Sequence, residues 1–123
     1  YGHAAGDDCL RRVAQALAGA LSEPDDFIAR YGGEEFMAIL TKTDHRRAVN
    51  VAENMIKSVS DLKIPHAHSS VAPYVTISVG LATTTPSSPR EIPRQLVESA
   101  DAMLYTAKQH GRNQLQSNDL TGC

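Results

Sequence analysis

Residues 31–36 read Tyr-Gly-Gly-Glu-Glu-Phe, a pair of glycines followed directly by two acids. β-Forming runs lie on both sides, "FIARY" before the glycines and "EEFMAIL" around and after the acids. Two such runs joined by Gly32-Gly33 predict a β-hairpin with a two-residue turn, because glycine accepts the positive φ angles that these turns need. Acids beside a tight turn fit a plain solvated hairpin tip, and they also fit a site for a metal ion and a phosphate.

Three helical patterns and two more strand patterns accompany this hairpin. Apolar residues at spacings of three and four predict helices from about residue 6 to 21, from Asp44 to Leu62, and from about residue 94 to a stop at Gly111. The β-branched run 74–84 predicts a strand, in which Gly80 marks a bulge or a close backbone approach, and 112–115 predicts a short last strand. This order predicts an α+β domain whose helices pack on a central, mostly antiparallel sheet.

Composition limits the class of protein. The chain has 123 residues, enough for one domain, and a net charge of −2 that argues against a nucleic-acid binder with a broad basic face. Its two cysteines, Cys9 and Cys123, form neither a disulfide framework nor a zinc-binding pair. No apolar run approaches the ~20 residues that span a bilayer, and we expect no signal peptide. A cytoplasmic domain is the simplest interpretation, and a membrane anchor elsewhere in a longer parent protein is compatible with it.

Charged side chains at two places are candidates for chemistry. Successive strand side chains point to opposite faces, so Glu34 and Glu35 reach one ligand together only if a bulge intervenes. Lys108 and Arg112 lie four apart near a helix end and are expected to share a face, where they either pair with the helix dipole or hold phosphates. The pair His66 and His68 is a weak zinc candidate, since no cysteine or third histidine lies nearby.

Four segments together resemble the GGDEF family of diguanylate cyclase domains. They are "YGHAAGD" at 1–7, "GGEEF" at 32–36, "TISVGLA" at 76–82 and "SADAMLYTAKQHGRN" at 99–113, in the family's order and spacing. The resemblance implies a nucleotide-cyclase or palm-like fold with a ferredoxin-like core over residues 1–115. It also implies that the domain's first strand and helix are missing from this chain. We expect the remaining tail, 116–123, to be disordered.

The resemblance also implies an activity. Such enzymes condense two GTP molecules into the bacterial second messenger cyclic di-GMP and release two pyrophosphates, with Mg²⁺ or Mn²⁺ as cofactor. Each GTP is presented by one domain of a homodimer. By similarity, Glu34 is the metal ligand and a catalytic residue that helps to deprotonate the attacking hydroxyl, and Glu35 is a catalytic residue that supports the hairpin and the activity.

The remaining family positions concern substrate binding. Gly32 and Gly33 match the glycines on which the nucleotide lies, and Asp7 matches the acid that reads the guanine edge. A carboxylate suits that task because guanine N1 and N2 are both donors. Lys108 and Arg112 match the cations that contact phosphate.

Two departures from the family pattern shape the expectations. The family's opening strand carries an acid that shares the metal, followed by a lysine and a guanine-contacting asparagine, and all three would lie before Tyr1. We therefore expect this stretch alone to be inactive. The family's inhibitory product site, Arg-x-x-Asp, is degenerate here, because Glu23 stands in the arginine position while Asp26 matches.

Two alternatives to an active cyclase follow from these departures. One is a non-catalytic module that binds GTP or cyclic di-GMP and regulates a linked domain, and the other is a fragment that is functionless without its missing part. In every case we expect a sensory or regulatory domain upstream in the parent protein and no nucleic-acid partner.

Overall fold

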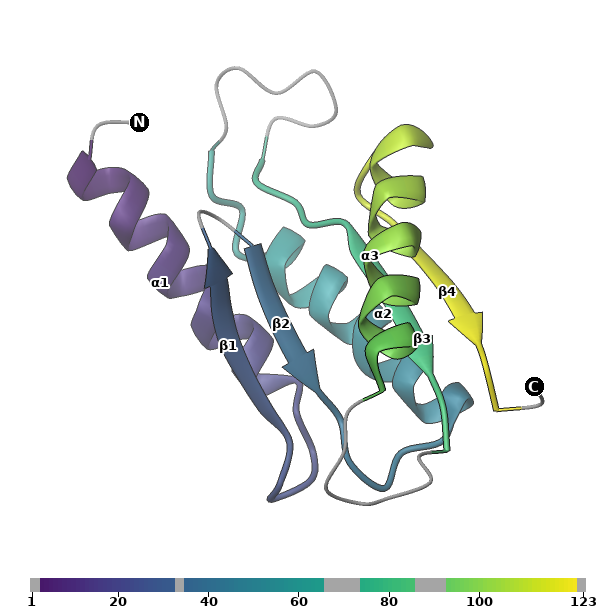
Figure 1. The fold of residues 1–123 in the computed structure, drawn as a ribbon. Helices are drawn as coiled ribbons and strands as arrows, with labels where there is room; N and C mark the ends of the chain where they lie inside the picture. Colours follow the sequence, from purple (N-terminus) through teal and green to yellow (C-terminus); the bar gives the residue numbers. More distant parts are fainter. Residues whose placement is uncertain (1–2, 33–34, 66–73, 86–92, 122–123) are drawn as a thin grey trace.

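The structure is a computed structural model that describes residues 3–32, 35–65, 74–85 and 93–121 of the chain. Its elements follow the expected order of helix, strand, strand, helix, strand, helix, strand, so the predicted α+β class is confirmed (Figure 1). They are α1 (His3–Gly19), β1 (Phe27–Gly32), β2 (Glu35–Ile39), α2 (His45–Asp61), β3 (Val79–Thr83), α3 (Arg94–Gln109) and β4 (Leu115–Asp119).

The strands form two small sheets within the described residues, and the expected single, mostly antiparallel sheet is not present there. β1 and β2 pair antiparallel as a hairpin, whereas β3 and β4 pair parallel. The parallel pairing follows from the connection: α3 joins β3 to β4, and parallel strands need such a crossover. No ladder joins β2 to β3 in the part of the chain that the structure describes.

The strand expected over 74–84 is shorter than its composition indicates. Only Val79–Thr83 is β3, because a strand needs a partner for its ladder and β4 lies beside these five residues alone. The segment before it is held differently: the Val75 N–H donates to the Ile64 carbonyl over 2.7 Å, and Pro65 and Tyr74 form an isolated bridge. A β-rich sequence therefore stays without strand pairing over 75–78.

Two terminal predictions were wrong. α1 begins at His3, earlier than the predicted start at residue 6, so Asp7 lies inside the helix. The disordered tail expected from residue 116 is contradicted up to Asp119, because β4 extends that far through five paired positions with β3. The Leu120 N–H continues this contact by donating to the Thr83 carbonyl over 2.8 Å.

The hydrophobic core lies between α1, α2 and the strands. Its buried members are Val13 and Leu17 of α1, Met55 and Val59 of α2, and Ile64. Half-buried side chains of the hairpin and of the segment before β3 pack on this cluster. In Figure 1, α2 lies behind β3 and β4 while α3 lies in front of them, so this parallel pair is covered on both faces.

The predicted helix from Asp44 to Leu62 is confirmed almost to the residue. Asp44 is its N-cap and accepts a hydrogen bond from the Arg47 N–H, and Leu62 is its C-cap. Residues at spacings of four and three form its buried face: Ala48, Ala52, Met55 and Val59. Among the residues that the structure describes, no helix combines the length and apolar character needed to cross a membrane.

Gly80 is the point at which α3 lies directly on β3. A Cβ at this position would come within 2.7 Å of the Leu104 Cα and would also collide with the Ala100 carbonyl oxygen and the Leu104 nitrogen. These are backbone atoms of α3, so they cannot move aside as a flexible side chain would. The close approach that the sequence allowed at Gly80 is therefore confirmed.

We expect Gly80→Ala to destabilise the fold by about 1–3 kcal/mol or more, because α3 must shift to admit a methyl group. Gly6→Ala is the matched control, since nothing lies within 4 Å of a Cβ there and the position is helical. That change should stabilise by about 0.5–1 kcal/mol. Urea unfolding of both variants measures the difference, and equal stability of the two would contradict the packing described here.

Candidate functional site

An open cleft of about 550 Å³ lies between α1 and the β1–β2 hairpin. Its half-buried apolar lining includes Leu10, Ile28 and Phe36, and its charged side chains are Asp7, Arg11 and Arg30; Ala14 and Ala29 complete it. The volume is within the range of small-molecule sites, and an apolar surface with a few charged groups at its rim is typical of them.

The helix period places the α1 side chains of this cleft. Asp7, Leu10, Arg11 and Ala14 are spaced three, one and three apart, which puts them on one face of α1. Asp7 was a predicted site residue, and it does line the cleft. Leu10, Arg11 and Phe36 were missed, although the spacing from Asp7 along α1 was a signal for the first two.

The GGEEF residues, 32–36, lie where β1 ends and β2 begins. Gly32 is the last residue of β1 and pairs with Glu35, the first residue of β2, so the predicted Gly-Gly turn is displaced by one residue. Residues 33 and 34 connect the strands; Gly33 and Glu34 lie outside the described residues. A bulge interrupts the β1 ladder between Arg30 and Gly32.

Glu35 brings the hairpin and the end of α3 together. Its Oε1 lies 3.6 Å from the Lys108 Nζ, which joins two predicted site residues from distant parts of the chain. Figure 1 shows the start of α1, the end of β1, the start of β2 and the end of α3 at the same, upper end of the fold. The side chains of Glu35 and Lys108 are 54% and 35% exposed, so the ion pair is worth at most about 1 kcal/mol.

Arg112 does not occupy the helical position that its spacing predicted. α3 ends at Gln109, so Arg112 lies beyond the helix and the expected shared helix face with Lys108 is wrong. Gly111, Arg112 and Asn113 all have left-handed backbones, with φ of 107°, 64° and 49°. The chain turns sharply here before entering β4, and the Arg112 side chain is exposed.

No metal centre can be built from the described residues, because none of their His, Cys, Asp and Glu side chains form a group of three that could hold an ion. The expected ligand Glu34 lies outside the described residues, as do the zinc candidates His66 and His68. A hairpin carboxylate still has the donor chemistry that Mg²⁺ prefers.

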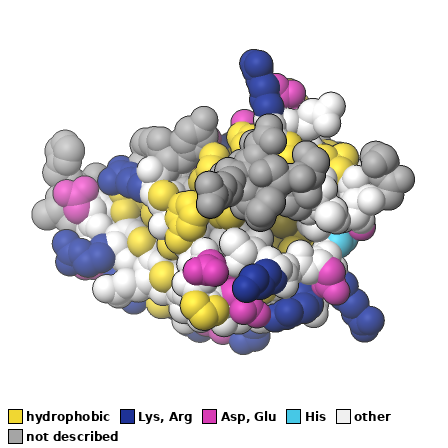
Figure 2. All heavy atoms as spheres, turned by 60° about the horizontal axis from the view of Figure 1, so that its bottom comes forward, with side chains coloured by type: hydrophobic (Ala, Val, Ile, Leu, Met, Phe, Trp, Pro, Cys, Tyr) yellow, Lys and Arg dark blue, Asp and Glu magenta, His cyan; other side chains and the backbone are white. Residues whose placement is uncertain are grey.

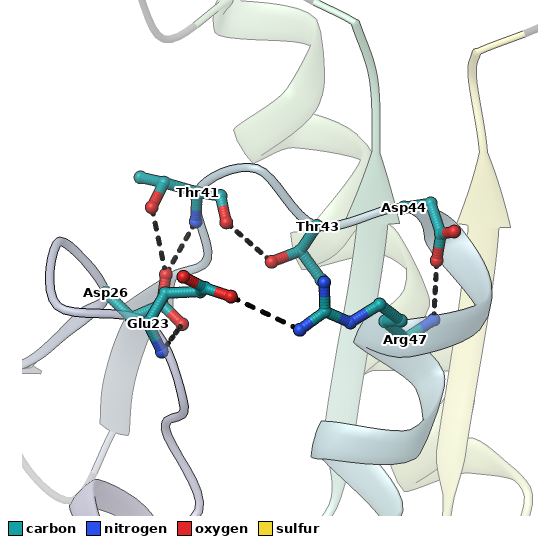
Figure 3. Close-up of polar contacts among 6 residues, drawn as sticks. All are labelled: Glu23, Asp26, Thr41, Thr43, Asp44 and Arg47. Carbon is teal, nitrogen blue, oxygen red and sulfur yellow. Dashed lines mark hydrogen bonds and ion pairs between the residues drawn. The ribbon is translucent and has the colours of Figure 1, made fainter.

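The degenerate inhibitory position lies at the opposite end of the hairpin. Asp26 accepts hydrogen bonds from the Thr41 N–H at 2.7 Å, the Thr41 hydroxyl at 3.1 Å and the Glu23 N–H at 3.2 Å (Figure 3). Glu23 points the other way, with its Oε1 3.3 Å from the Arg47 Nη2 of α2. Both acids therefore fasten the α1–β1 loop to neighbouring elements.

Charges of both signs surround this end of the molecule. Figure 2, in which the lower end of Figure 1 comes forward, shows Lys and Arg side chains interspersed with Asp and Glu over the described residues of that face. Such mixing does not provide the continuous basic surface that a nucleic-acid backbone requires.

Comparison with known proteins places nearly the whole chain in one family. The family described as "Diguanylate cyclase, GGDEF domain" matches residues 1–114. Diguanylate cyclase A of Treponema denticola is 40% identical over 122 residues, which are 98% of this chain and 32% of that protein. The chain thus spans about a third or less of the length of the curated relatives it matches.

Solved structures agree with this assignment. The coiled coil and GGDEF domain of DgcB from Caulobacter crescentus, in complex with c-di-GMP, aligns with a TM-score of 0.77 and 30% identity over 96% of this chain and 60% of that one. Diguanylate cyclase SiaD of Pseudomonas aeruginosa, in complex with its activator SiaC, aligns with a TM-score of 0.74 and 31% identity over 96% of this chain and 43% of that one.

Asp26→Ala should destabilise the fold by about 1–3 kcal/mol, because it leaves partly buried donors of Thr41 and Glu23 without their acceptor. The adjacent, exposed Asp25→Ala is the control and should change stability by less than about 0.5 kcal/mol. Chemical denaturation measures both, and a silent Asp26→Ala would show that these contacts do not hold the loop.

Proposed function

Because the chain belongs to the GGDEF family of diguanylate cyclase domains, we propose that it is the catalytic domain of a longer bacterial signalling protein. In this proposal it condenses two GTP molecules into cyclic di-GMP and releases two pyrophosphates. The observation that carries the proposal is the meeting of three features at one end of the fold: the cleft with Asp7, the GGEEF hairpin and the cationic end of α3.

The guanine base is assigned to the cleft. Its apolar lining suits a flat aromatic ring, and the Asp7 carboxylate can accept hydrogen bonds from the N1 and N2 donors of guanine. Adenine presents no such pair of donors on that edge, so Asp7 would select guanine. Gly32 and Gly33 would let the nucleotide pass close to the hairpin backbone.

The triphosphate is assigned to the space beside the hairpin and the end of α3. Lys108 and Arg112 would contact its oxygens, and charge-assisted hydrogen bonds of this kind are the stronger ones. Glu34 would hold Mg²⁺ or Mn²⁺, which when bound would neutralise phosphate charge at the reacting centre. Glu35 holds Lys108 beside the hairpin before the nucleotide arrives.

The reaction needs two copies of the domain. The 3′-hydroxyl of one GTP attacks the α-phosphorus of the other, forming an O–P bond as the bond to pyrophosphate breaks. A second attack in the reverse direction closes the ring. Each domain presents one GTP, so the active species is a homodimer whose two clefts face each other.

The two separate sheets fit a further part of the proposal, that the domain includes a strand and a helix ahead of residue 1. β2 and β3 each have an edge that no ladder joins to the other within the described residues, and residues 75–78 before β3 are β-rich without strand pairing. A strand inserted between these edges would complete one sheet. On this proposal the 123-residue stretch alone is inactive.

The full-length protein incubated with GTP and Mg²⁺ should form cyclic di-GMP, measured by chromatography, and Glu34→Ala should abolish it. Glu53→Ala is the control, because Glu53 is an exposed acid on α2. Its activity should match that of the wild type. A folded, dimeric, GTP-binding protein without product would overturn the cyclase proposal and favour a nucleotide-binding regulatory module.

Cyclic di-GMP should inhibit the enzyme weakly or not at all through the Glu23 and Asp26 position. Glu23 cannot replace a guanidinium that grips phosphate, and it already pairs with Arg47. Initial rates at rising product concentration test this expectation. Strong non-competitive inhibition in the micromolar range would contradict it.

A further inference from the structure

The turn that follows α3 has an unusual backbone. Three successive residues, Gly111, Arg112 and Asn113, have positive φ, and only the first is a glycine. L-residues avoid this region because the Cβ approaches the following carbonyl oxygen, although asparagine tolerates it better than arginine does. A left-handed Arg112 persists only where its surroundings hold it.

The side chain of Gln114 stabilises this left-handed turn through hydrogen bonds. Its Nε2 donates to the His110 carbonyl oxygen at 2.8 Å and to the Arg112 carbonyl oxygen at 3.2 Å, bridging the turn. Its Oε1 accepts from the Gln116 Nε2 at 2.8 Å. Carbonyl oxygens only accept, so the amide nitrogen must face them, and Gln116 fixes that orientation of the amide.

The backbone of the same turn is attached at two more points. The Asn113 N–H donates to the Ser78 hydroxyl at 3.2 Å, just before β3, and the Arg112 N–H donates to the Ala107 carbonyl at 2.9 Å. None of these contacts uses the guanidinium of Arg112. They fix where its backbone lies and leave the charged group exposed.

We propose that Gln114 is a positioning residue for phosphate binding. By bridging the carbonyls of His110 and Arg112, it keeps the left-handed turn in place and so aims Arg112 at the end of the fold where Glu35 holds Lys108. The two cations are then presented together before any nucleotide binds. This inference rests on the proposed function, because it assumes that a nucleotide triphosphate binds there.

The proposal separates phosphate binding from base binding. Gln114 contacts the turn after α3, whereas the cleft assigned to guanine is formed by α1 and the hairpin. Loss of the Gln114 amide should therefore weaken binding of GTP and leave binding of guanosine unchanged. A substitution that only destabilised the whole fold would weaken the binding of GTP and of guanosine together.

The test compares Gln114→Met with Gln109→Met in the full-length protein. Methionine keeps the length of the side chain and removes the amide in both variants, and Gln109 is an exposed residue at the end of α3. Dissociation constants for GTP and for guanosine are measured by calorimetry. Hydrogen exchange of the Asn113 amide reports on the turn itself, without any nucleotide.

Gln114→Met should weaken GTP binding by about 5-fold, the equivalent of one lost hydrogen bond, with guanosine unchanged. It should also speed exchange of the Asn113 amide, and Gln109→Met should do neither. Unchanged GTP affinity in Gln114→Met, or an equal loss for guanosine, would overturn the inference alone. A wild-type protein that binds GTP no better than guanosine would overturn the proposed triphosphate site and this inference with it.

Discussion

The contact between α3 and β3 at Gly80 determines where the rest of the site can be. α3 approaches the strand so closely that its backbone at Ala100 and Leu104 fills the space of a Cβ. Lys108 lies one turn further along the same helix, and Arg112 follows in the turn beyond it. Because the helix is rigid over this distance, the packing at Gly80 also determines how far the cations lie from the hairpin.

The β1–β2 hairpin runs between two ends of the molecule that differ in how their charged side chains are engaged. At one end it meets the cleft and Lys108, where charged groups remain exposed enough to meet a ligand. At the other end Asp26 is engaged by donors of Thr41 and Glu23, and Glu23 is engaged by Arg47. The acids of that second end therefore stabilise a loop junction, whereas Asp7 and Glu35 at the first end are exposed.

Local patterns predicted the elements well where one periodicity dominated. The span of α2 depends mainly on residues within the helix, and it was found almost as expected. The hairpin was also predicted from neighbouring residues, with an error of one position in its turn. Asp7 was placed by family resemblance, and the cleft around it follows from the period of α1.

Features that depend on distant partners could not be predicted in this way. Residues 75–78 have strand composition, yet pairing requires a neighbour that local propensity does not supply. Thr41 lies fifteen residues from Asp26, so no short-range pattern connects them. Arg112 was misplaced because it follows Gly111, the predicted helix stop, and a spacing of four places two residues on one face only within a helix.

The weakness of the Glu35–Lys108 ion pair and the neutral contacts that position Arg112 explain how both cations remain free to contact a ligand. The Glu35–Lys108 pair is long and partly exposed, so breaking it to free Lys108 for the proposed phosphate contact would cost little. The positions of Lys108 and Arg112 instead come from backbone packing at Gly80 and from amide and hydroxyl contacts to the turn. Neutral contacts of this kind orient a cation without competing for its charge. In the proposed triphosphate site, both cations would therefore be positioned in advance, and only the weak pair with Glu35 would have to be displaced from Lys108.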